Sequence, residues 1–158
     1  TAIKPDVLAG RTPLFSLLCD MNRLFESWIA HKLKPCAHQQ GWHLRTQGPR
    51  RYLAMREGDL PQFQLRPDIA FVDDNEVPQL IADTKWKLLS QKDRKLGVSN
   101  TDIYQLYAYA GRYNVPHVQL IYPAQAGLEP QYEFKLQGMH EPSLTVKTVA
   151  IESNALMT

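Results

Sequence analysis

Two apolar segments joined by a short acidic link constrain the fold of this chain more than any other feature. The first runs from Phe63 to Val72, the second from about Gln79 to Leu88, and Asp73-Asp74-Asn75 lies between them. Both alternate apolar and polar side chains, which is the period of a β-strand. So short a link lets the two strands pair only as an antiparallel hairpin. Asp73, Asp74 and Glu76 are therefore interpreted as turn residues.

The polar sides of these two strands carry charged residues. Asp68 lies on the polar side of the first strand, and Asp83 and Lys85 lie on that of the second. If the apolar sides face a common core, these three side chains meet on the open face of the sheet. Two carboxylates then offer the oxygen ligands that Mg²⁺ prefers, and a lysine can position water or offset phosphate charge. The same pattern also fits a plain solvated sheet face, because Asp-x-Lys is common by chance.

Amphipathic helices and further strands surround this hairpin. The pattern predicts one helix from Thr12-Pro13 to Lys34-Pro35 and a second from Ser99 or Asn100 to about Asn114. A polar loop, 89–99, precedes the second helix. Other predicted strands cover 42–46 and 52–55, which form an early hairpin around Gln47-Gly48-Pro49, then 117–122 and two edge strands, 132–136 and 144–151. This order indicates an α/β fold with one central mixed sheet.

The length suits one domain over residues 1–158, with a lead-in at 1–11, a core at 12–125 and C-terminal edge strands at 126–158. No apolar run approaches the roughly 18 residues of a membrane helix. Cys19 and Cys36 form no disulfide framework, so we expect reduced thiols and a cytoplasmic location without membrane contact. Because the chain begins at Thr1, we expect a domain cut from a longer subunit.

The net charge of +2 excludes a uniformly basic nucleic-acid binder, so any DNA contact needs a local patch. Basic residues cluster in two regions, around the early hairpin and after the second apolar strand. Arg and Lys in such loops neutralise phosphates without reading bases, although they also occur in ordinary solvated loops. The candidate DNA-binding residues are Arg45, Arg50, Arg51, Lys87, Lys92, Arg94 and Lys95.

Pro67-Asp68, followed after a turn by a strand ending Asp83-Thr84-Lys85, resembles the core of the PD-(D/E)xK nucleases. The resemblance implies a restriction-endonuclease-like sheet flanked by helices. In that family a helix before the sheet often supplies another acidic residue, and Glu26 fits that place. Gln105 and Tyr109 resemble the Q-xxx-Y pattern of RecB-like members and fall on one helical face, apart from the apolar stripe.

The resemblance also implies the roles of these residues. Asp68, Asp83 and Glu26 would hold Mg²⁺, which Mn²⁺ can replace. Lys85 would be catalytic beside these acids, with Gln105 and Tyr109 in support.

Five blocks in the same order resemble the nuclease domain of the McrC family, the cleavage subunits of McrBC-type modification-dependent restriction systems. The resemblance covers about residues 12–125. The blocks are Asp20-Met21-Asn22-Arg23-Leu24-Phe25-Glu26, Arg66-Pro67-Asp68-Ile69, Asp83-Thr84-Lys85-Trp86-Lys87, Asp102-Ile103-Tyr104-Gln105-Leu106-Tyr107-Ala108-Tyr109 and Leu120-Ile121-Tyr122-Pro123.

This second resemblance implies a Mg²⁺-dependent DNA endonuclease that works with an McrB-like AAA+ motor. GTP would enter only through that partner, which would also recognise the DNA modification. Nuclease domains would pair on double-stranded DNA. Two alternatives remain open: a RecB-like repair exonuclease, and a catalytically silent DNA-binding or assembly module of the same fold. The intact acidic and lysine set argues against the silent module.

Overall fold

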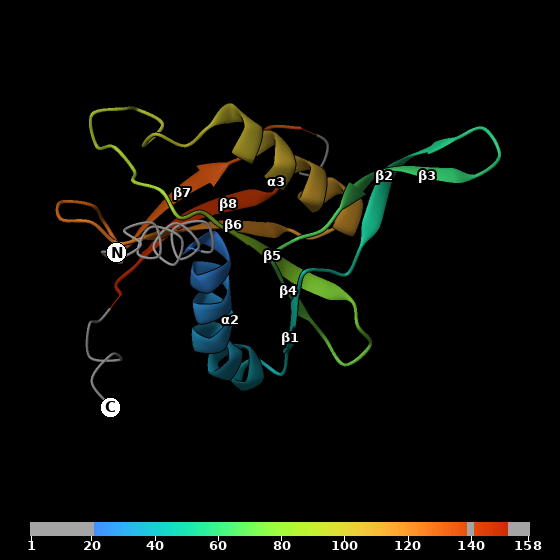
Figure 1. The fold of residues 1–158 in the computed structure, drawn as a ribbon, viewed down its shortest axis with the longest axis horizontal. Helices are drawn as coiled ribbons and strands as arrows, with labels where there is room; N and C mark the ends of the chain where they lie inside the picture. The colour runs from blue at the N-terminus through green and yellow to red at the C-terminus, as the bar shows by residue number, and fades with distance from the viewer. Residues whose placement is uncertain (1–20, 139–140, 152–158) are drawn as a thin grey trace, which may run out of the picture.

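A six-stranded mixed sheet forms the centre of the computed structural model, which describes residues 21–138 and 141–151 (Figure 1). The strand order is β1-β4-β5-β6-β8-β7, with β5–β6 and β6–β8 parallel and the other pairs antiparallel. The sheet strands are β1 (His43–Thr46), β4 (Ile69–Val72), β5 (Pro78–Thr84), β6 (His117–Pro123), β7 (Gln131–Lys135) and β8 (Ser143–Val149). The predicted α/β class with a central mixed sheet is confirmed.

Two helices flank the sheet, and each has its own apolar core (Figure 1). Helix α2 (Met21–Gln39) places Phe25 and Ile29 against Phe71 and its neighbours. Helix α3 (Asn100–Tyr113) places Leu106 and Tyr109 against the other group of sheet residues. Alternate residues of β4 and β5 enter the two cores, so both faces of the central strands are covered. Neither helix in the described residues is long and apolar enough to cross a membrane.

The predicted hairpin of two apolar strands is partly confirmed. Strands β4 and β5 do pair antiparallel across the short acidic turn, where Asp73 accepts hydrogen bonds from two backbone N–H groups. The first strand is shorter than predicted because it breaks at Arg66-Pro67-Asp68. Pro67 has no N–H to donate to a ladder and fixes its own φ. Residues before the break pair elsewhere, in a separate two-stranded arm, β2 (Arg51–Arg56) and β3 (Leu60–Leu65).

Three other sequence predictions are wrong in detail. The early strands do not form a hairpin with each other, because β1 pairs with β4 and β2 with β3. Strand β8 lies between β6 and β7, so of the two predicted edge strands only β7 lies at an edge of the sheet. Helix α2 continues through Pro35 to Gln39. Pro35 has no N–H for the carbonyl of His31, which lies on an exposed turn where water can replace the missing donor.

Other predictions hold or lie outside the described residues. Helix α3 follows the N-cap Ser99 and ends at Asn114, as predicted. Asn114 adopts the left-handed conformation common at helix C-termini. Loop 89–99 is turn-rich and anchored, since Leu89 and Val98 are buried. The predicted helix start at Thr12-Pro13, Cys19 and the lead-in 1–11 lie outside the described residues.

The arm is fixed to helix α3 at its base and extends away from the sheet (Figure 1). The Tyr113 hydroxyl donates to the carbonyl oxygens of Pro49 and Leu65 at the two ends of the arm. The Arg51 guanidinium lies 4.7 Å from the centre of the Tyr113 ring. The same arginine donates to the carbonyl of Arg112, 2.9 Å away. Tyr113 therefore joins the arm to the body.

We expect Tyr113→Phe to lower the free energy of unfolding by about 1 kcal/mol, because the carbonyl oxygens of Pro49 and Leu65 lose their hydroxyl donor while the ring and its cation–π contact remain. Urea unfolding measures the change. Tyr104→Phe is the matched control, since Tyr104 is 69% exposed on the same helix. Equal stabilities of the two variants would contradict the anchoring role.

Candidate active site

The β4–β5 hairpin brings Asp68 and Asp83 together. The register pairs Ile69 with Ala82, and one further step sets Asp68 across from Asp83. Asp68 is fixed by two hydrogen bonds to its Oδ2, from the backbone N–H of Thr84 at 2.8 Å and from its hydroxyl at 2.9 Å. The other carboxylate oxygen of Asp68 lies outside these bonds. The two acids therefore meet, as the alternation along the strands indicated.

Asp83 does not lie on an open face, contrary to the sequence prediction. It is only 3% exposed because the sheet face that carries it also carries Ile81 and is covered by helix α3. Burial and repulsion from Asp68 raise the pKa of Asp83 to about 6, although Lys85 favours the charged form. Asp83 Oδ2 is buried and receives no hydrogen bond of good geometry. Its close partner is the Lys85 ammonium, at 2.7 Å.

Lys85 lies one residue beyond the end of β5, and its backbone N–H donates to the carbonyl of Ile121, 2.9 Å away. Its ammonium contacts three acceptors: Asp83 Oδ2 at 2.7 Å, Asp102 Oδ1 at 3.1 Å and Gln105 Oε1 at 3.3 Å. Burial disfavours the charged form, but the two carboxylates favour it more strongly. The pKa of Lys85 is therefore raised, and this lysine is an ammonium rather than a general base.

Asp102 is a site residue that the sequence reasoning missed. It is 9% exposed in the first turn of α3, where its backbone N–H donates to the Ser99 hydroxyl. Its carboxylate lies 3.1 Å from Lys85 Nζ and 3.6 Å from Lys87 Nζ. Burial opposes ionisation, but Ser99 and the two ammonium groups lower the pKa of Asp102. An acidic residue three positions before Gln105, on the same helical face, is the sequence signal that could have identified it.

Gln105 and Tyr109 lie together, as predicted from their spacing. Gln105 Nε2 donates to the Tyr109 hydroxyl at 2.9 Å, which orients its carbonyl oxygen toward Lys85. The sequence prediction that Tyr109 lies apart from the apolar stripe is wrong. Tyr109 is 2% exposed and is part of the core under α3. Burial and the nearby Asp83 raise the pKa of Tyr109, so its hydroxyl stays protonated.

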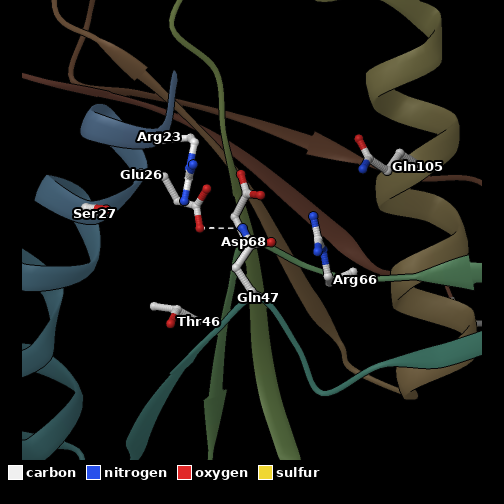
Figure 2. A pocket seen from close by; sticks show the side chains of 8 residues that line it. All are labelled: Arg23, Glu26, Ser27, Thr46, Gln47, Arg66, Asp68 and Gln105. Carbon is white, nitrogen blue, oxygen red and sulfur yellow. Dashed lines mark hydrogen bonds between the residues drawn. The ribbon is translucent and has the colours of Figure 1, made fainter. Parts of the chain in front are cut away.

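A cavity of about 850 Å³ opens in front of Asp68 (Figure 2). Glu26 reaches it from α2 and Gln105 from α3, with Asp68 between them (Figure 2). Glu26 accepts a hydrogen bond from Gln47 Nε2. Burial raises the pKa of Glu26, as does repulsion from Asp68, while the bond from Gln47 opposes the rise. The sequence reasoning assigned no role to the other lining residues, Arg23, Ser27, Thr46, Gln47 and Arg66.

The donor set at this cavity fits a hard divalent cation. Asp68 has a carboxylate oxygen outside its hydrogen bonds, and the buried Asp83 Oδ2 has only an ammonium as partner. Mg²⁺ is commonly held by one or two carboxylates and keeps several waters. Within residues 21–138 and 141–151, no three His, Cys, Asp or Glu side chains form a ready metal cluster. The fit therefore rests on Asp68 and Asp83, and Glu26 stays a predicted third ligand.

The candidate DNA-binding residues have varied surroundings. Arg45 forms an exposed ion pair with Glu76, and Arg51 is engaged with Tyr113 and Arg112. Lys95 donates to Asn100 at 3.3 Å. Lys87 lies beside Asp102 at the candidate site. Exposed side chains without a described polar partner are those of Arg50, Lys92 and Arg94.

A family model described as "McrBC 5-methylcytosine restriction system component" matches residues 2–123. The chain belongs to this family. The match confirms the resemblance to McrBC systems that the five sequence blocks indicated. No curated protein matches this chain.

A solved structure shares the fold of this member of the McrBC family. It is described as a refined half-complex from the tetradecameric assembly of Thermococcus gammatolerans McrB AAA+ hexamers with bound McrC. The similarity has a TM-score of 0.63 at 16% identity and covers 87% of this chain. The chain spans 30% of the length of that matched chain.

We expect Asp83→Asn to gain stability relative to wild type as pH rises in the metal-free protein. The folded-state pKa of Asp83, about 6, lies above its ordinary value of 3.8, so folding takes up a proton between these values. The protonated Asp83 carboxyl stabilises the folded wild type below pH 4, and this contribution is lost as the pH rises through 6, whereas asparagine does not titrate. The free energy of unfolding of Asp83→Asn minus that of wild type should therefore increase by about 2–3 kcal/mol from pH 4 to pH 7.

Urea unfolding of both proteins in chelator measures this difference. Asp93→Asn, in the turn-rich loop, is the control for loss of a carboxylate. If the free energy of unfolding of Asp83→Asn relative to wild type stays constant or falls between pH 4 and pH 7, burial does not raise the pKa of Asp83.

Proposed function

We propose that this chain is the nuclease portion of an McrC-type subunit and that it hydrolyses DNA phosphodiesters with Mg²⁺. The observation that carries the proposal is the buried Asp83–Lys85 pair beside Asp68, which lines a polar cavity. Acidic residues on paired strands with an adjacent lysine fit the PD-(D/E)xK pattern. Membership of the McrBC family supports the same activity.

Asp68 and Asp83 would hold the cation, with Glu26 as a third acidic group. Bound there, Mg²⁺ would polarise the phosphodiester and lower the pKa of a coordinated water. Lys85 stays protonated, so it would stabilise negative charge on the phosphate or orient the attacking water. Gln105 would hold the Lys85 ammonium in place, with Tyr109 fixing the Gln105 amide.

Arg23 and Arg66 line the cavity beside the acids and would contact phosphates next to the scissile one. The basic residues predicted from sequence would extend this contact, and Arg50, Lys92 and Arg94 are exposed and can approach a duplex. Lys87 would first have to leave Asp102, and Lys95 would have to leave Asn100. Arg45 and Arg51 would first have to leave their present partners.

The partners follow from the family. The similar solved structure is an assembly of McrB AAA+ hexamers with bound McrC, which supports an McrB-like AAA+ motor as partner. GTP would act through that motor, and modified double-stranded DNA would be the substrate. Two nuclease domains paired on the duplex would cut both strands. The nuclease subunit and its motor would act together in the cytoplasm.

We expect Asp83→Ala and Lys85→Ala each to reduce cleavage of covalently closed circular DNA by at least about 100-fold in the complete system with its motor. Each change removes a group that would act on the reacting phosphate or its cation. Agarose-gel assays of supercoiled plasmid measure the rate. Circular DNA also separates an endonuclease from an exonuclease, which needs an end.

Lys135→Ala is the control for loss of a lysine charge, since Lys135 lies on the edge strand β7 in an exposed pair with Glu141. It should cleave at the wild-type rate. Wild-type cleavage by Lys85→Ala would remove the proposed role of this lysine, and wild-type cleavage by both site variants would favour the silent module.

A further inference from the structure

The Lys85 ammonium lies against the Asp83 carboxylate, which is also the group that would hold the divalent cation. It lies 2.7 Å from Asp83 Oδ2, which is buried and has no other close polar partner among the described residues. Mg²⁺ binds carboxylate oxygens at about 2.0–2.1 Å. An ammonium and a divalent cation on the same carboxylate would repel each other, because Asp83 is shielded from water. Binding of the cation at Asp83 therefore favours a shift of the ammonium toward another acceptor.

A second carboxylate is already in place to receive it. Asp102 Oδ1 lies 3.1 Å from Lys85 Nζ, so a small rotation of the flexible lysine stem suffices. Asp102 is held in the first turn of α3, where its N–H meets the Ser99 hydroxyl and where the helix dipole favours a negative charge. Gln105 Oε1 at 3.3 Å offers a further acceptor on the same side.

We propose that Asp102 takes over the Lys85 ammonium from Asp83 when a divalent cation binds, and so frees Asp83 for the metal. Asp102 is thus a positioning residue for Lys85 rather than a metal ligand. The inference rests on the proposed metal-dependent function. The cation would be of the hard divalent class, and the lysine would stay charged and close to the reacting phosphate in the loaded site.

The test is the affinity of the metal-free chain for Mn²⁺ alone, measured by calorimetry without DNA. We expect Asp102→Asn to weaken Mn²⁺ binding about tenfold, because Lys85 then competes for Asp83 without an alternative carboxylate. Lys85→Met should bind more tightly than wild type. In the Lys85→Met background, adding Asp102→Asn should change the affinity by less than about twofold, since no ammonium remains to be moved.

Further variants separate this transfer of the Lys85 ammonium from Asp83 to Asp102, here called the handover, from a general charge effect. Asp102→Glu keeps the carboxylate and should bind within about threefold of wild type. Glu57→Gln removes an acidic charge from the exposed turn of the arm and should leave Mn²⁺ affinity unchanged. Circular dichroism and thermal melts check that each variant folds, and Asp102→Ser provides the same comparison if the amide variant does not.

Two results would overturn the handover: unchanged Mn²⁺ affinity in Asp102→Asn, or the same tenfold weakening when Lys85 is already methionine. The Mn²⁺ affinities of wild type and Asp83→Asn show whether the handover alone fails or the proposed function fails as well. If wild type binds Mn²⁺ and Asp83→Asn does not, the metal site stands even where the handover fails. If wild type binds no Mn²⁺, the proposed metal site and the handover both fail.

Discussion

The ion pair between Asp83 and Lys85 is the interaction on which the arrangement of the candidate site depends. An unpaired carboxylate at 3% exposure would be costly, and removing one partner of a buried ion pair commonly destabilises a protein by about 3–5 kcal/mol. Yet Asp68 lies next to this pair and raises the cost of ionising Asp83. The site thus holds more negative charge than Lys85 alone balances, which favours the proposed divalent cation.

The surrounding elements position this pair. The β4–β5 hairpin fixes Asp68 against the backbone of Thr84, and the bond from the Lys85 N–H to Ile121 extends the parallel ladder past the end of β5. Helix α3 then closes over the pair and contributes Asp102 and Gln105. The Asp83 carboxylate is therefore shielded from water, while Asp68 opens toward the cavity. A strand end that remains hydrogen-bonded gives a rigid base for a lysine that has to change partners.

The sequence predicted the parts of the site that follow from local periodicity, but it did not indicate the parts that depend on tertiary packing. Alternation along two strands placed Asp68, Asp83 and Lys85 together, because pleating fixes the side of every residue once the pairing is known. It did not show that α3 covers that side, since a sheet buried on both faces leaves little contrast between its apolar and polar positions. Asp102 was missed because helical spacing alone does not say which strand a helix will cover. The break at Pro67 was missed because apolar residues continue on both sides of it.

The cavity in front of Asp68 is reached from both faces of the sheet, and this divides the site between two cores. Glu26 follows Phe25 in α2, so its position depends on the packing of Phe25 and Ile29 against one face. Gln105 and Asp102 depend on the packing of Leu106 and Tyr109 against the other face. Only at the strand ends can residues from opposite faces meet, because the sheet separates them everywhere else. The proposed third acidic group and the lysine acceptors are therefore positioned by separate cores, and the proposed cation site lies where these cores adjoin.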